Sequence, residues 1–353
     1  MSRFVLDCAV SRPVDAEISQ WLGMAAIRGW ARPSGGYHEA KISSALLQEA
    51  GRAISEATAM TSTVFLPDLA SAVTYAVSDV VLNGAFEVVV TSAADPVVIQ
   101  QASAMAAAQL GLAHQIVGVD ETGRVSELPE RAVLLTSAVN PEIGCVQRDL
   151  SGWAESTRSA VVLDATSAYG WVALPAADRL ILDPRAWGCP AGTVAVASSA
   201  PGRQPAFDNV PAAVVAGLAC QRWASQCHEA SRRTGAQTRR IVSRVVSEIP
   251  DVDIHGGAAT DAPHILSLSV LYMDAEALQT RLDALGYAVG SGSACASLRG
   301  QPSHVLAAIG ALTSGNVRLG LPPGLPDEAV DGFVDAFGAV VAQIRDEMGT
   351  SGL

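Results

Sequence analysis

Seven short apolar runs, separated by helical stretches, constrain the fold of this chain more than any other feature. The runs are Thr63–Leu66, Phe86–Thr91, His114–Val119, Ala132–Thr136, Ser159–Asp164, Arg179–Leu182 and Thr193–Ala197. Helical patterns fill most of the gaps, for example Pro96–Leu110 after the expected cap Asp95. This alternation predicts an α/β fold with a mostly parallel seven-stranded sheet covered by helices. Any ligand site is then expected at the edge where the strands end.

The pattern changes after a helix-rich segment over about residues 208–249. The later elements are a strand at Ile265–Tyr272, a helix at Ala275–Leu285, a short strand at Tyr287–Val289 and a final helix from Asp327 to Met348. This arrangement indicates a smaller α+β unit. We therefore expect a large α/β domain over residues 12–250 and a small domain formed by residues 1–11 and 251–353.

Composition excludes several classes of function. The 353 residues carry a net charge of −12, which disfavours direct binding to nucleic acid. The chain has no apolar run of membrane-spanning length and no signal peptide pattern at its start. Its six cysteines follow no zinc-binding spacing. We expect a cytoplasmic protein with reduced cysteines, no metal site, no membrane association and no nucleic acid ligand.

A cysteine flanked by small polar residues is the strongest candidate for chemistry. Cys295 lies in the segment Gly290–Ser297, GSGSACAS, which is followed by Pro302–Leu306, PSHVL. Small polar neighbours favour an exposed loop, from which a thiolate can reach a sulfur donor and then an acceptor. A buried structural cysteine is the alternative.

This loop resembles the active-site loop of NifS/IscS-type cysteine desulfurases, a family of class V aminotransferase-like proteins with fold-type I. Four further blocks resemble family motifs in the same order: Val5–Ala9, Asn140–Gln147, Leu163–Ser167 and Gly315–Leu321. The resemblance implies a dimer and a cofactor, pyridoxal phosphate (PLP). It also implies that Cys295 carries a persulfide, that Arg318 binds a substrate carboxylate and that Asp164 faces the pyridine nitrogen. A structural salt bridge is the alternative role for Arg318.

The PLP lysine of the family is missing. The family motif S-x-H-K-x-x-G-P-K-G corresponds to residues 183–192, which places Ala186 at the lysine and Arg185 at the preceding histidine. The chain contains a single lysine, Lys41, in a predicted amino-terminal helix away from the sheet edge. An internal aldimine requires an amine.

Three more cofactor contacts differ from the family pattern. The phosphate-binding turn contains Pro67 and Asp68, Asp95 replaces the histidine that stacks on the ring, and Ser167 replaces a glutamine. A phosphate cradle needs free N–H groups and no negative charge. Only Asp164 remains, and an Asp at a strand end also commonly caps a turn. We therefore expect that the chain binds no PLP.

Three functions remain open. The first is a pseudoenzyme subunit, in a homodimer or in a heterodimer with an active cysteine desulfurase, that acts as a scaffold, an activator or a relay of sulfur between proteins through Cys295. The second is an active enzyme, either of the desulfurase type or with cofactor-free thiol chemistry. Its cleft would be lined by Asp68, Asp95, Asp164, Arg185, Trp187, Cys189 and Cys295, unless Trp187 fills the space. The third is an interaction protein in which Cys295 has no role and the arginines of residues 232–244 form a docking face.

Overall fold

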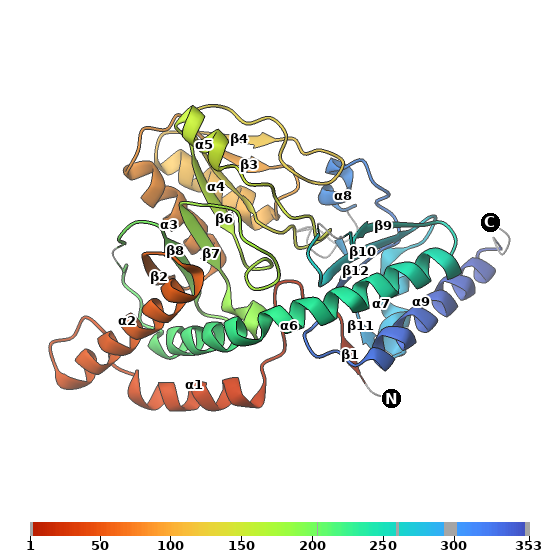
Figure 1. The fold of residues 1–353 in the computed structure, drawn as a ribbon, viewed down its shortest axis with the longest axis horizontal. Helices are drawn as coiled ribbons and strands as arrows, with labels where there is room; N and C mark the ends of the chain where they lie inside the picture. Colours follow the sequence, from red (N-terminus) through yellow and green to blue (C-terminus); the bar gives the residue numbers. More distant parts are fainter. Residues whose placement is uncertain (1–2, 203, 259–260, 293–301, 350–353) are drawn as a thin grey trace.

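The computed structural model describes residues 3–202, 204–258, 261–292 and 302–349. Its main sheet has the strand order β2-β8-β7-β6-β5-β3-β4 (Figure 1). The strands are β2 (Ser62–Leu66), β3 (Val88–Ser92), β4 (Ala113–Val117), β5 (Ala132–Ser137), β6 (Ala160–Asp164), β7 (Arg179–Leu182) and β8 (Val194–Ser198). Strand β8 runs antiparallel to both of its neighbours, β2 and β7, and the other pairs of this sheet are parallel. All seven predicted runs form strands, and the predicted α/β fold is confirmed.

Helices cover both faces of this sheet. They are α1 (Ala16–Arg28), α2 (His38–Thr58), α3 (Leu69–Leu82), α4 (Val97–Gln109), α5 (Ser151–Thr157) and α6 (Val210–Glu248). Side chains alternate between the faces along a strand, so Leu134 of β5 packs in the core beneath α1, α2 and α6, whereas Leu135 packs beneath α3 and α4. Strands buried on both sides explain the continuous apolar runs.

The carboxyl-terminal part forms a second core. Its three-stranded antiparallel sheet has the order β12 (Asn316–Gly320), β10 (Ile265–Val270) and β9 (Val252–Gly256). Strand β1 (Phe4–Val5) pairs in parallel with β11 (Tyr287–Ala288), which ties the amino terminus to this part. The helices are α7 (Ala275–Ala284), α8 (His304–Ala308) and α9 (Asp327–Glu347).

Helix α6 links the two cores. Its first half contributes Val215 and Ala216 to the core beneath the large sheet, and its second half contributes Ile241 and Val245 to the small core. The helix runs as one continuous element along both parts (Figure 1).

Two arginines in the second half of α6 form ion pairs with acidic residues of α9. Arg240 lies 2.7 Å from Asp331, and Arg244 lies 2.7 Å from Asp335. Both carboxylates belong to α9, so these arginines join two helices of the small part. This arrangement favours a structural role for the predicted docking face.

None of the helices in the described ranges is long and apolar enough to cross a membrane.

Candidate functional site

The turn at the position of the family lysine is the 3-10 helix η1 (Pro184–Trp187), which follows β7. Asp183 caps it, since one carboxylate oxygen accepts the backbone N–H of Arg185 at 3.0 Å. The other oxygen accepts the guanidinium of Arg185 at 2.5 Å. Ala186 is buried, with 5% of its surface exposed. Arg185 is therefore engaged within its own turn, and the buried side chain at position 186 is a methyl group.

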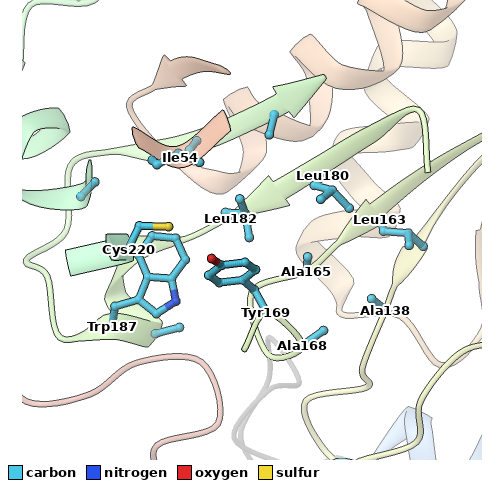
Figure 2. Packing of buried hydrophobic residues seen from close by; sticks show 14 of the residues in the cluster. Ile54, Ala138, Leu163, Ala165, Ala168, Tyr169, Leu180, Leu182, Trp187 and Cys220 are labelled. Carbon is cyan, nitrogen blue, oxygen red and sulfur yellow. The ribbon is translucent and has the colours of Figure 1, made fainter. Parts of the chain in front are cut away.

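Trp187 packs into the core between the sheet and α6. Its ring meets that of Tyr169 at a centroid distance of 5.6 Å with an interplanar angle of 67°. Figure 2 shows both rings beside Cys220 of α6. The indole is thus part of the hydrophobic core that contains Leu182.

Cys189, which was expected to line the cleft of an active enzyme, is also buried. Burial is the largest cause that raises the pKa of its thiol to about 12. The thiol is therefore protonated at neutral pH, which opposes a role as nucleophile.

Asp68 occupies the start of α3. Its carboxylate accepts the backbone N–H of Ser71 at 2.7 Å, and its carbonyl accepts the N–H of Ala72 at 3.0 Å. A carboxylate is a favourable helix cap because it satisfies a free donor and complements the helix dipole. The Asp68 carboxylate thus already occupies the position at this helix end where an anion would bind.

Asp95 is buried at the end of β3, and the expectation that it caps the following helix is wrong. Residue 96 is the cap of α4 and makes no side-chain cap bond. Instead, the Asp95 carboxylate accepts the N–H groups of Ser92 at 2.7 Å and Ser137 at 2.8 Å. It also accepts the hydroxyl of Thr136 at 2.9 Å. Burial raises the pKa of Asp95 to about 6, although these hydrogen bonds favour the charged form.

Asp164 and Ser167 make local contacts after β6. The Asp164 carboxylate accepts the N–H of Thr166 at 3.0 Å. Burial raises the pKa of Asp164, and the nearby charge of Asp183 adds to this effect. Ser167 donates its hydroxyl to the carbonyl of Ala9 at 2.9 Å. Asp164 therefore caps the turn after β6, which is the alternative role considered for it in the sequence analysis.

Arg318 lies on β12 and pairs with a carboxylate of the chain. Its guanidinium is 2.6 Å from Asp7, and its side chain is 7% exposed. Gly290 lies directly against both groups, since a Cβ at that position would come within 2.7 Å of Arg318 Nη2. The ion pair matches the structural alternative for Arg318.

A buried polar cluster next to Arg318 was not singled out from the sequence. Ser303 donates its hydroxyl to Oε1 of Glu142, while Oε2 of Glu142 has no hydrogen-bond partner within the described ranges. Burial raises the pKa of Glu142, and Arg318 opposes that shift. Asn316 accepts the N–H of Gly292 at 2.8 Å and donates to a serine of β10. These residues belong to the matched motifs. Their polar character within those motifs was the sequence signal that could have identified the cluster.

Cys295 lies outside the described residues. The described residues Gly292 and Ser303, which flank residues 293–301 in the sequence, both belong to this cluster. Gly292 packs against the carboxyl group of Glu142, where a Cβ would lie 2.7 Å from its Cδ. Ser303 bonds the same carboxyl group. Gly292 and Ser303 therefore lie close together beside Glu142.

Within the ranges that the structure describes, no group of three or more His, Cys, Asp or Glu side chains is placed to hold a metal ion. The other five cysteines, all described, form no disulfide. Burial raises the pKa of Cys8 to about 11 and that of Cys220 to about 12, so both thiols are protonated at neutral pH.

Sequence comparisons connect this chain with cysteine desulfurases. Residues 197–333 match the aminotransferase class-V family model. A cysteine desulfurase of Trichormus azollae is 26% identical over 147 residues, which cover 41% of this chain and 37% of that protein. The Homo sapiens cysteine desulfurase is 26% identical over 243 residues, which cover 62% of this chain and 53% of that protein. The matched segments thus span about a third to a half of these curated relatives.

Solved structures show the same fold over almost the whole chain. A NifS-like protein superposes with a TM-score of 0.84 at 16% identity, covering 97% of this chain and all of the other. The apo cysteine desulfurase from Thermococcus onnurineus NA1 gives a TM-score of 0.81 at 14% identity, covering 97% of this chain and 95% of the other. The chain therefore has the fold of these NifS-like proteins, and parts of its sequence are similar to the class-V aminotransferase family and to cysteine desulfurases.

Proposed function

We propose that this chain is a cysteine desulfurase-like pseudoenzyme of the cytoplasm that forms no PLP aldimine. In this proposal it serves sulfur transfer as a partner subunit, either paired with itself or with an active cysteine desulfurase. Its own contribution is to receive and pass on sulfur at Cys295.

The residues at the cofactor positions do not fit PLP. Ala186 offers no amine, and the single lysine of the chain, Lys41, is exposed on α2. Asp68 places a carboxylate at the helix end where a phosphate would need N–H donors. The aldehyde of PLP would therefore lack an amine, and its phosphate would lack N–H donors. A single neighbouring residue cannot replace both groups.

The observation that carries the proposal is the contrast between the cofactor positions and the residues that flank the cysteine segment. At the cofactor positions, Asp68 caps α3 and Arg185 is held by Asp183. Gly292 and Ser303, which flank residues 293–301 in the sequence, both contact Glu142, near buried Arg318. A relay needs an accessible thiolate and no cofactor. The GSGSACAS segment that contains Cys295 is retained in the sequence, and it supports a role that does not depend on PLP.

The relay step is a thiolate attack on a persulfide. The Cys295 thiolate attacks the terminal sulfur of a donor persulfide, the S–S bond of the donor breaks, and a new S–S bond forms at Cys295. The donor leaves as a thiolate, so the step needs no external oxidant or reductant. Attack by an acceptor thiolate on the Cys295 persulfide repeats the exchange.

Mass spectrometry of the intact chain and its peptides tests this proposal. Incubation with glutathione persulfide is expected to add one sulfur atom to Cys295 of the wild type and none to Cys295→Ser. Cys227→Ser, which removes a partly exposed thiol elsewhere, should still gain sulfur. Failure of the wild type to gain sulfur at Cys295 would overturn the relay.

A further inference from the structure

Arg12 lies in an aromatic stack between β1 and α1. Its guanidinium carbon is 4.3 Å from the ring centroid of Trp223 and 5.3 Å from that of Trp171. Trp171 stacks in turn on His264, with centroids 4.1 Å apart and planes at 6°. The backbone N–H of Arg12 donates to the carbonyl of Arg185 at 2.9 Å. The arginine is thus held by ring faces and by the η1 turn.

The charge of Arg12 has no counter-ion in the described part of the chain. Its Nε is buried without a hydrogen-bond partner there, and no carboxylate in those ranges forms an ion pair with it. Burial is the largest cause that lowers the pKa of Arg12 to about 10, so the side chain remains charged at neutral pH. A charge that is largely removed from water and left unpaired is costly.

The two acidic residues that line the same cavity as Arg12 are already engaged. Asp15 lies 2.9 Å and Glu17 lies 2.8 Å from Arg222, which takes both carboxylates. The Asp15 carboxylate also caps α1 by accepting the N–H of Ile18 at 2.8 Å. Neither group is therefore free to turn toward Arg12, and an anion for Arg12 must come from outside these groups.

Arg12 lines a cavity of a size suited to a small molecule. The cavity holds about 450 Å³. Trp187, Trp223, Pro322 and Pro323 form its apolar walls, and the charged residues Asp15, Glu17 and Arg222, which are paired with one another, also line it. Volumes of about 300–1,000 Å³ are typical of small-molecule sites. The walls come from the η1 turn, helix α6 and the segment that follows β12, so one ligand would contact both parts of the molecule.

We propose that this cavity binds a small organic carboxylate, with the carboxylate on Arg12 and the apolar body against Trp223 and the prolines. The planar guanidinium presents a fork of donors that matches a carboxylate. Stacking on two tryptophans keeps this fork in place before the ligand arrives. The site is separate from Cys295 and does not rest on the relay.

Tryptophan fluorescence of the full chain tests the proposal, because two tryptophans line the cavity. The probes are benzoate and its neutral isostere benzamide, with inorganic phosphate as a second anion. Benzoate is expected to change the emission saturably and to bind at least about tenfold more tightly than benzamide, with phosphate weaker than benzoate. Equal binding of benzoate and benzamide would overturn the proposal, as would phosphate binding as tightly as benzoate.

Variants locate the effect on the arginine. Arg12→Gln is expected to lose the preference for benzoate over benzamide. Arg232→Gln, which changes an exposed arginine of α6, should keep it. Cys295→Ser should also keep it, which separates this site from the relay. A preference for benzoate that persists in folded Arg12→Gln would contradict the assignment, and if that variant does not fold, the comparison of probes on the wild type decides.

Discussion

Asp68 and Asp95 give the residue-scale picture, because both place a carboxylate where the family pattern has a group that contacts PLP. Each carboxylate is used by the chain itself. Asp68 caps α3 through Ser71, and Asp95 joins the end of β3 to the end of β5 through Thr136. The replacements therefore have structural roles of their own, and we expect them to contribute to stability.

Asp95 predicts a pH dependence of that stability. Its pKa is about 6 in the folded protein against an ordinary value of 3.8, so the folded state binds the proton more tightly. The stabilising contribution of the protonated group is present in full below the ordinary value and is lost as the pH rises through about 6. The loss is at most about 3 kcal/mol, from about two pKa units at ~1.36 kcal/mol each.

Urea unfolding of the wild type and Asp95→Asn between about pH 4 and pH 7 measures this effect. The asparagine does not titrate, and its changed hydrogen bonds give a constant offset. The wild-type unfolding free energy minus that of the variant should fall as the pH rises. A difference that stays constant over this range would show that Asp95 does not titrate as described.

At the scale of elements, helices α2 and α6 depend on a residue without a side chain. A Cβ at Gly217 of α6 would lie 3.0 Å from the Cα of Ala50 and 3.1 Å from its carbonyl oxygen. Both neighbours are backbone atoms of α2, so they cannot move aside alone. This contact fixes how closely α6 approaches the large core.

Gly217→Ala is therefore expected to destabilise the protein. Alanine favours a helix by about 1 kcal/mol over glycine, but overpacking costs about 1–3 kcal/mol, and here the clash should prevail. Gly23→Ala in α1 is the matched control, because no atom lies within 4 Å of its added Cβ. Urea midpoints should fall for Gly217→Ala and rise slightly for Gly23→Ala. A rise for both would contradict the close packing.

Sequence patterns predict the strands of the large sheet because burial on both faces makes each one apolar. Strand β9 contains no apolar run and is missed, because Val252 and Ile254 alternate with Asp253 and His255 at the edge of the small sheet. Motif comparison places Ala186 at the position of the family lysine, and in the structure this residue is buried in η1. Motif comparison does not predict the contacts of Asp95, because the hydrogen bond that Thr136 donates to its carboxylate forms only when two strands pack side by side.

At the scale of the whole molecule, the fold is independent of the cofactor positions. The NifS-like protein shares it with a TM-score of 0.84 at 16% identity. Such a fold depends on the buried pattern of strands and helices, which this chain retains, and not on particular polar residues. The residues Ala186, Asp68 and Asp95, which differ from the family pattern, are therefore compatible with an intact fold.

Reduction of the purified chain with borohydride in the presence of PLP and L-cysteine tests the central claim most directly. Borohydride fixes any aldimine as a stable adduct that mass spectrometry can locate, and alanine reports desulfuration. We predict that no alanine forms. Any adduct should be confined to exposed Lys41 or the amino terminus, and these amines should react equally well in the unfolded chain. Alanine production with a saturable adduct that requires the folded chain would contradict the account.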